Sequence, residues 1–397
     1  MAPSRTVIIA GAGIGGLTAA LAIAQRGYRV AVFDQAPRLE EVGAGIQLSP
    51  NASRILIALG LREQLQRHVV APQELRVMNA QSAHMLARAP LGAAAEARYG
   101  APYWVIHRGD LQAVLIEAVG ANQDISLHLG ARVEDFALHQ NGVTISALAS
   151  QRPVEERGCA LICADGLWSK LRERLGHQAA PQFARHTAWR ALAPADALVP
   201  DLRAPAVNLW LGRDAHLVHY PVRGGSLINI VAIIRDDWRE PGWNAPGLRH
   251  DILARYPSGL WPKAARVIVA APERWHKWAL YDRAPTAHWG KGPVTLLGDA
   301  AHPMLPYLAQ GAAMAIEDAA VLAQRLADTP DDPDGAMRRY ERQRRSRTAR
   351  AQHAARRNGM AYHMGGAGAV LRTLALLAMG GQRLIARYDW LYGWKPG

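Results

Sequence analysis

Three glycines near the start of the chain have the spacing of a phosphate-binding turn. Gly11, Gly13 and Gly16 follow the apolar run 7–10 and precede an alanine- and leucine-rich segment. In such a turn the first glycine permits the tight bend, the second lets backbone approach a pyrophosphate, and the third lets the helix pack closely on the strand. The helix N-terminus adds N–H donors and a positive dipole. Asp34 ends the next apolar run, where a carboxylate can bind a ribose hydroxyl. The pattern predicts dinucleotide binding, and a purely structural turn is the alternative.

Two later turns place an aspartate beside a glycine after a short apolar run. Asp165 precedes Gly166 at the first of them, and Asp299 follows Gly298 at the second. Asp299 is expected at the mouth of a strand, where its carboxylate can bind a hydroxyl group. A helix is expected over 310–326, and its N-terminal N–H groups would stabilise a neighbouring anion by about 0.3–2 kcal/mol. The alternatives are a capped turn and a plain buried helix.

The elements that must position these residues begin as alternating strand and helix. A strand, the glycine turn, a helix and a second strand over 28–33 form a βαβ start. From about residue 186 to residue 278 strands alternate and tryptophans cluster, which indicates an inserted antiparallel sheet. A polar helix (336–357) and an apolar helix (370–387) follow. We therefore expect an α/β fold with an α+β second lobe, divided into residues 1–185 with 280–330, residues 186–279 and residues 331–397.

The three motifs occur together in the order and spacing of one known family. From residue 5 to about residue 350 the sequence resembles the FAD-dependent aromatic-ring hydroxylases, the group A flavoprotein monooxygenases. Within this family it is most similar to the salicylate hydroxylase and 3-hydroxybenzoate 6-hydroxylase subgroup. The resemblance implies a Rossmann-like FAD-binding domain with an inserted substrate-binding sheet and C-terminal helices. Asp34 stands where the family usually has Glu, but the shorter acid can still reach a ribose.

The resemblance also implies the cofactors and the reaction. FAD is the cofactor, and NAD(P)H, with NADH favoured, binds at a groove without a Rossmann domain of its own. O2 and a phenolic aromatic acid, salicylate- or 3-hydroxybenzoate-like, would react through a C4a-hydroperoxyflavin. The residues implied to bind FAD are Gly11, Gly13, Ile14, Gly15, Gly16, Asp34, Gln35, Gly45, Ile46, Arg108, Asp165, Gly298, Asp299, Gly311, Ala312 and Ala313.

The substrate side needs a base or hydrogen-bond acceptor near the phenol, with a pKa near the working pH. On an expected strand, His219 and His216 point to opposite faces. The resemblance favours His219 as the catalytic and substrate-binding residue, and a structural histidine is the alternative. Gln310 and Pro303 are the further catalytic candidates, the proline through backbone near the reactive edge of the flavin. Weaker substrate-binding candidates are Tyr103 and Arg190.

Composition excludes several classes of protein. Half of the residues are hydrophobic and a fifth are charged, which excludes a disordered chain. Two cysteines exclude a disulfide scaffold and fit a reducing cytoplasm. We find no HExxH motif and no Cys/His pairing at zinc spacing, so no metal site is expected. No apolar run is long enough to span a membrane, although 369–385 comes nearest.

The net charge of +13 has a local source. Nine arginines and one glutamate lie between Arg338 and Arg357. A charged, solvated helix face is the simplest interpretation, and steering of an anionic aromatic acid or NAD(P)H is the functional one. Nucleic-acid binding is disfavoured because no basic stripe interleaved with aromatic residues occurs. A flavin monooxygenase of a biosynthetic or quinone-precursor ring remains the main alternative. We expect a cytoplasmic monomer or homodimer without an integral membrane segment.

Overall fold

The computed structural model describes residues 5–39, 44–150 and 152–396. A six-stranded sheet, in the order β18-β19-β11-β1-β2-β7, forms the centre of the nucleotide-binding part. Its strands are parallel except β18, which runs antiparallel to β19. Their apolar runs are buried, as expected of parallel strands covered on both faces. The bounds are β1 (Thr6–Ala10), β2 (Arg29–Asp34), β7 (Ile125–Leu129), β11 (Ala160–Cys163), β18 (Gly290–Lys291) and β19 (Val294–Leu296).

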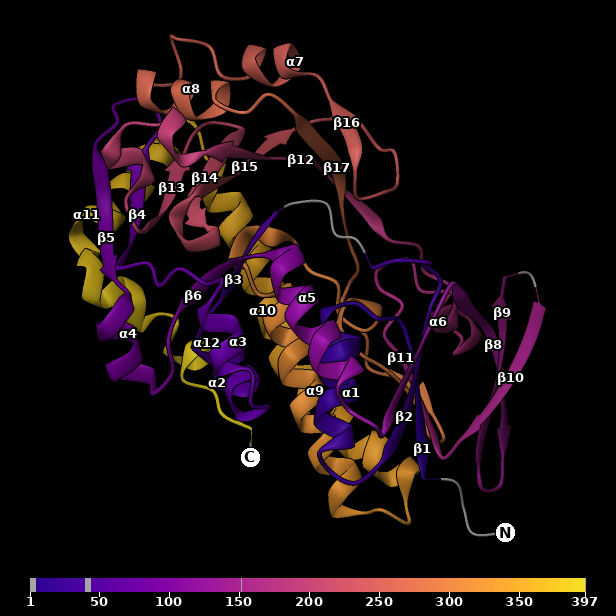
Figure 1. Cartoon of the computed structure of the whole chain (residues 1–397). Helices are drawn as coiled ribbons and strands as arrows, with labels where there is room; N and C mark the ends of the chain where they lie inside the picture. The colour runs from indigo at the N-terminus through magenta and orange to yellow at the C-terminus, as the bar shows by residue number, and fades with distance from the viewer. Residues whose placement is uncertain (1–4, 40–43, 151, 397) are drawn as a thin grey trace.

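A layer of helices lies against this sheet (Figure 1). Helix α1 (Ile14–Ala24) follows the glycine turn and packs against α5 (Arg108–Gly120) and α9 (Gly311–Asp328). Helix α10 (Pro333–Tyr362) packs against the outer side of α9. Helix α1 is buried on nearly all sides, which explains its run of alanine, leucine and isoleucine.

A second, eight-stranded sheet runs in the order β16-β17-β12-β15-β14-β13-β4-β5. All neighbours are antiparallel except β13 and β4. One face packs against α7 (Arg249–Ala254) and α8 (Lys263–Ala270), while α11 (Gly366–Ala386) lies beside β5 (Figure 1). The bounds are β4 (Glu74–Asn79), β5 (Met85–Pro90), β12 (Gln182–Pro194), β13 (Ala206–Leu211), β14 (Ala215–Val222), β15 (Leu227–Arg235), β16 (Ala245–Gly247) and β17 (Trp275–Asp282).

Smaller elements complete the fold. A three-stranded sheet comprises β8 (Ala131–His139), β9 (Gly142–Ala149) and β10 (Arg152–Gly158), and β3 (Gly45–Leu48) pairs with β6 (Trp104–His107). The remaining helices are α2 (Pro50–Ala58), α3 (Arg62–Gln66), α4 (Gly92–Tyr99), α6 (Leu171–Arg174) and α12 (Asp389–Tyr392).

The expected α/β fold with an inserted, largely antiparallel lobe and C-terminal helices is confirmed. The large sheet also takes β4 and β5 from residues 74–90, which the sequence-based division assigned to the cofactor-binding unit. This happens because β4 pairs in parallel with β13, a contact between residues far apart in the sequence. The three-part division itself stays a prediction.

The arginine-rich helix α10 is only partly a solvated surface. Arg344 is fully buried, and it pairs with Glu317 at 2.6 Å and Asp318 at 2.7 Å. Arg347 also pairs with Glu317 at 2.6 Å. These ion pairs join α10 to α9, so part of the positive charge is balanced inside the protein. Removing one partner of such a buried pair typically costs about 3–5 kcal/mol.

One segment of the described chain, Gly366–Tyr392, is long and apolar enough to cross a membrane by length and composition. The helices of soluble cores can pass the same test. In the structure its α11 packs against β5, and Leu384 and Ile385 join a buried apolar cluster. Its side chains at 370, 371, 374 and 377 are exposed.

Candidate active site

The glycine turn forms an opening lined by backbone at the N-terminus of α1. Gly11 has a φ of +113°, and a Cβ there would lie 2.3 Å from the carbonyl oxygen of Ala164. A Cβ on Gly16 would lie 1.9 Å from the carbonyl oxygen of Gly11. Gly13 has open space around it, and no side chain caps α1. The first N–H groups of α1 are therefore available to an anion.

Asp34 lies beside this opening at the end of β2. Its Oδ2 accepts the N–H of Ala12 at 2.6 Å, and its Oδ1 accepts the N–H of Ala36 at 2.8 Å. Both bonds fix the carboxylate, whose oxygens retain capacity for a hydroxyl donor. Ile14 is buried in the first turn of α1, whereas Gln35 is exposed next to Asp34.

Asp318 holds the second glycine–aspartate turn in place. Its Oδ2 accepts the N–H of Gly298 at 3.0 Å and lies 2.5 Å from Nε2 of His302. The guanidinium of Arg344 donates to Oδ1 at 2.7 Å. Burial alone would raise the pKa of Asp318, but its neighbours His302 and Arg344 lower it. His302 and Asp318 thus hold this loop together.

Asp299 faces the start of α9. Its Oδ1 lies 3.8 Å from the position that a Cβ on Gly311 would take. Burial raises the pKa of Asp299, and the charges of His302 and Arg108 act against this rise. Arg108, at the start of α5, thus shares an environment with Asp299 although nearly two hundred positions separate them in the sequence. No side chain caps α9, so its first N–H groups are left without a side-chain partner next to Asp299.

Asp165 carries an unsatisfied polar atom. Its Oδ1 is buried without a hydrogen-bond partner, while Oδ2 accepts a long bond of 3.4 Å from the N–H of Leu171. Burial raises the pKa of this carboxyl. A buried oxygen without a partner costs free energy unless a ligand supplies a donor.

These features fit FAD. The uncapped α1 turn with Gly11, Gly13 and Gly16 would hold the pyrophosphate, and Asp34 a ribose hydroxyl. Asp299 would bind the ribityl chain, while the α9 N-terminus at Gly311, Ala312 and Ala313 would face the isoalloxazine. The opening, the unsatisfied Asp165 Oδ1 and the small residues at α9 are the observations on which this fit depends.

A small cavity of about 100 Å³ adjoins the start of α9. Pro306, Tyr307, Leu308 and Ala309, which directly precede the α9 N-cap, form part of its wall. The rest comes from distant segments, including strands β3, β4, β5, β13 and β14 and the C-terminal helices. Tyrosines dominate its polar wall, and none of the lining residues is Lys, Arg, Asp or Glu. The lining is Gln47, Leu75, Ala89, Leu91, Tyr103, Val207, Leu209, His216, Val218, Pro306, Tyr307, Leu308, Ala309, Asn358, Tyr362, Leu384, Ile385, Tyr388 and Tyr392.

The two histidines of β14 lie on opposite faces, and the structure places His216 at the cavity. His219 is fully buried on the other face, where Trp210 Nε1 donates to its Nδ1 at 3.4 Å. Burial lowers the pKa of His219 to about 3. His219 therefore does not line this cavity, and its predicted contact with the substrate stays a prediction. Alternation along a strand separates the two faces, but only the packing of α7 and α8 decides which face is covered.

The other two predicted substrate-side residues, Tyr103 and Arg190, also differ in whether they line the cavity. Tyr103 lines the cavity, and its hydroxyl donates to Gln47 at 2.6 Å. Arg190 does not line the cavity; its side chain donates to the carbonyl of Trp243 at 2.5 Å and lies over Trp278. The predicted role of Arg190 in substrate binding stays a prediction.

Gln310 and Pro303 have structural contacts near the flavin side. The amide of Gln310 donates to Ser49 at 2.9 Å and accepts from Asn51 at 3.0 Å, which ties the α9 N-cap to α2. The carbonyl of Pro303 accepts from Gln352 at 2.8 Å. Pro306, three residues later, is the proline that lines the cavity. Pro303 and Pro306 lie in the same short segment, so their spacing in the sequence could not show which of them lines the cavity.

Of the tyrosines in the cavity wall, only Tyr103 was predicted from the sequence. Tyr307, Tyr388 and Tyr392 line the cavity, the latter two from the C-terminal segment. Gly359 in α10 permits this arrangement, since a Cβ there would lie 2.6 Å from the Tyr307 ring. A glycine inside a polar helix was the available signal.

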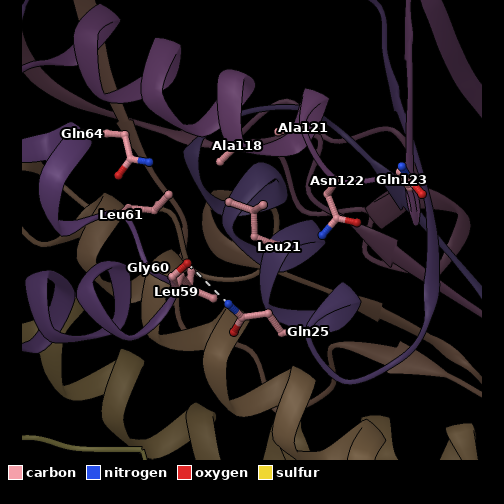
Figure 2. Close-up of a pocket in the computed structure, with 10 residues that line it drawn as sticks. All are labelled: Leu21, Gln25, Leu59, Gly60, Leu61, Gln64, Ala118, Ala121, Asn122 and Gln123. Carbon is pink, nitrogen blue, oxygen red and sulfur yellow. Dashed lines mark hydrogen bonds between the residues drawn. The ribbon is translucent and has the colours of Figure 1, made fainter.

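A second hollow, shown in Figure 2, has no lining residue in common with the aromatic cavity. It is lined by the ends of α1 and α2, by Leu61 and Gln64, and by the α5 C-terminus. Its lining contains no acid, base or histidine. This hollow therefore lacks the chemistry of an active site.

A glycine-rich cradle for FAD joined to an aromatic cavity defines a flavin-dependent monooxygenase. Residues 4–355 match the family described as FAD binding domain, and the chain belongs to this family. The chain is 37% identical to a 3-hydroxybenzoate 6-hydroxylase of Polaromonas naphthalenivorans, over 98% of this chain and 96% of that protein. The fold is similar to Klebsiella pneumoniae HpxO with FAD and uric acid, with a TM-score of 0.85, 25% identity and coverage of 98% and 96%. A salicylate hydroxylase substrate complex gives a TM-score of 0.82, 27% identity and coverage of 100% and 96%.

The expected FAD cofactor and the NAD(P)H- and O2-dependent monooxygenase class are confirmed.

Proposed function

We propose that this enzyme hydroxylates the ring of a monocyclic phenolic acid, of the salicylate or 3-hydroxybenzoate type. The observation that carries the proposal is a buried imidazole, His216, in the wall of a small aromatic cavity beside the start of α9. Ring hydroxylation needs the phenol oxygen to lose its proton, so that electron density enters the ring. The Nδ1 of His216 is bonded to His363 at 2.7 Å, which leaves Nε2 as the nitrogen available to the phenol. We assign His216, in place of His219, as the base.

FAD would supply the reactive oxygen after reduction by NAD(P)H and reaction with O2. The residues of this chain orient the ring and exclude water. Tyr103, Tyr307 and Val218 would enclose the ring of the substrate. The N-terminal dipole of α9 would stabilise negative charge on the reduced flavin. We further propose that Gln310 takes part in catalysis and that the residues predicted to bind FAD hold the cofactor in this arrangement.

A carboxylate in this cavity would be held by neutral donors. None of the lining residues is cationic, but the hydroxyl of Tyr307 is buried without a hydrogen-bond partner. Asn358 adds an amide to the same wall. We therefore assign the Tyr307 hydroxyl as the group that binds the substrate carboxylate. This neutral donor would do what a cationic side chain does in other carboxylate sites.

The neutral wall also favours a second candidate, a neutral phenolic ring such as a biosynthetic or quinone-precursor ring. Such a substrate has no carboxylate to anchor, and the exposed apolar side chains of α11 would suit its delivery from an apolar phase. The two candidates differ in the charge of the substrate, which a substrate panel can decide.

The test measures NADH and NADPH oxidation by purified, FAD-loaded enzyme over matched pairs of rings with and without the carboxylate. Salicylate and 3-hydroxybenzoate are compared with phenol and with their methyl esters, and products are identified. We expect an acid to accelerate oxidation and to yield a hydroxylated product. Faster turnover of the neutral rings would favour the second candidate, and protein that cannot bind FAD would overturn both.

We also propose a cytoplasmic enzyme that works as a monomer or homodimer. Cys159 and Cys163 are both free and buried, which fits a reducing compartment. Cell fractionation and light scattering of the purified enzyme test the two statements separately.

A further inference from the structure

Three imidazoles form a continuous row that starts at the substrate cavity. His216 Nδ1 lies 2.7 Å from His363 Nε2, and His363 Nδ1 lies 2.9 Å from His186 Nε2. The rings belong to β14, the C-cap of α10 and β12, so their meeting depends on the tertiary fold. His216 is 2% exposed, whereas His363 and His186 are each only partly buried. The row therefore leads from the cavity wall toward the surface.

A backbone carbonyl sets the direction of the hydrogen bonds. His186 Nδ1 lies 2.8 Å from the carbonyl oxygen of Ala184, which can only accept, so this nitrogen carries the proton. Neutral His186 must then accept at Nε2 from His363, and His363 must accept at Nε2 from His216. The remaining nitrogen, His216 Nε2, carries a lone pair. The Ala184 carbonyl at the outer end thus fixes the tautomer of each ring, so that His216 presents an unprotonated nitrogen to the cavity.

The surroundings of the row are aromatic inside and charged outside. The rings of Tyr307 and Tyr362 pack against His216, with centroids at 5.6 Å and 5.3 Å. Burial and Arg372 lower the pKa of His363. Burial and Arg235 also lower the pKa of His186, while the Ala184 carbonyl and Asp214 raise it. A positive charge is therefore disfavoured most beside the cavity, where His216 is buried, and less at the outer end, where His186 is only partly buried.

We propose that His216, His363 and His186 form a proton-transfer chain between the bound phenol and solvent. This inference rests on the proposed function, in which His216 is the base. The phenol O–H bond breaks, its electron pair stays on the oxygen, and the proton bonds to His216 Nε2. His216 passes its Nδ1 proton to His363 Nε2, and His363 passes its Nδ1 proton to His186 Nε2. His186 then carries the positive charge, and its Nδ1 releases a proton to water when the bond to the Ala184 carbonyl opens.

The chain is reset by the reverse transfer. After release, each of the three rings is neutral with its proton on Nε2, so His216 presents an N–H to the cavity. A proton taken up from water at His186 Nδ1 drives the shifts backward and returns a proton to the phenolate oxygen of the product. No atom or electron pair is left over in the cycle.

Burial explains why a chain is needed at all. It lowers the pKa of His216 well below 6.5 and that of His363 to about 3. A proton held on His216 alone would therefore be unstable, and an isolated His216 would be a poor base. Transfer to His186, at the outer end, removes the charge from the apolar interior.

The experiment uses FAD-loaded enzyme and follows phenolate formation from 3-hydroxybenzoate, or from salicylate if that is the better substrate, by stopped-flow absorbance. A pH-indicator dye records the released proton. His363→Ala leaves an imidazole-sized gap in the row, and His363→Phe fills it. We expect phenolate formation to slow roughly 10²-fold in both variants, a loss typical of acid–base catalysis. Added imidazole should restore the rate in His363→Ala and leave His363→Phe slow.

Two further variants keep the test decisive. His186→Ala interrupts the outer end and should also respond to imidazole, so it serves if the His363 variants fail to fold. His250→Ala is the control, because that side chain is 78% exposed and remote from the row. Wild-type rates in His363→Ala, or slow rates that imidazole does not restore in either alanine variant, would overturn the chain. Failure of the proposed function gives a different result, because the wild-type enzyme itself would then form no phenolate.

Discussion

The FAD cradle and the substrate cavity lie next to each other but are built in different ways. The cradle is made largely of backbone at three short turns, where the absence of a Cβ at Gly11 and Gly16 matters more than any side chain. The cavity is made of side chains from segments between Gln47 and Tyr392. A backbone site tolerates few changes at its glycines, whereas a side-chain cavity can change its substrate by single replacements. This difference explains how related enzymes can share one kind of FAD-binding site and still act on different aromatic substrates.

The C-terminal helices belong to the cavity half of this comparison. Tyr388 and Tyr392 line the cavity, and Tyr99 and Asp389 share a hydrogen bond of 2.7 Å that holds α12 near α4. Arg347 donates to the carbonyls of Trp390 and Leu391. The arginine-rich helix thus positions the segment that completes the substrate wall.

The largest expected effect breaks the cradle. Gly16→Val places a side chain where even a Cβ would lie 1.9 Å from the Gly11 carbonyl oxygen, so the turn cannot keep its shape. We expect complete loss of bound FAD, measured by visible absorbance of the purified protein. The matched control is Gly120→Ala in α5, where a Cβ meets no atom within 4 Å. A yellow Gly16→Val protein with wild-type flavin content would contradict the backbone description of the cradle.

The next largest effect is a difference in kcat between variants on the two faces of β14. His216→Leu removes the base at the cavity and should lower kcat about 10²- to 10⁴-fold while FAD stays bound. His219→Leu changes only the face packed against α7 and α8, so its kcat should stay within about twofold of wild type when stability is sufficient. Steady-state NADH oxidation with product analysis measures both. Equal losses of kcat in the two variants would argue against the assignment of His216.

These two regions also differ in how far the sequence alone could predict them. The glycine turn, Asp34, Asp299 and the α9 helix were predicted from local spacing because backbone conformation is a local property. The strand that carries His216 and His219 was predicted equally well, because β14 lies in the expected antiparallel sheet. The sequence could not predict which of the two histidines faces the cavity, because this depends on which face of the sheet α7 and α8 cover.

Other features were out of reach for the same physical reason. Pairing of β4 with β13 and the contribution of Tyr388 to the cavity are contacts between distant parts of the chain. Burial of Arg344 was also missed, because its partners Glu317 and Asp318 lie on another helix. A charged residue on a polar helix gives no local sign that it is buried.

The smallest predicted effect concerns stability rather than turnover, and it sharpens the description of the His219 face. Burial lowers the pKa of His219 from 6.5 to about 3, and protonation would also break the bond that Trp210 donates to Nδ1. Between these pH values the unfolded state binds a proton that the folded state does not, so stability falls as pH falls. One such histidine contributes a slope of about 1.4 kcal/mol per pH unit. Urea unfolding of His219→Leu from pH 6 to pH 4 should show a slope smaller than wild type by roughly this amount, whereas the carboxylates contribute equally to both proteins and cancel. The exposed variant His250→Leu should keep the wild-type slope, and an unchanged slope in His219→Leu would mean that His219 is already protonated or solvated in the folded enzyme.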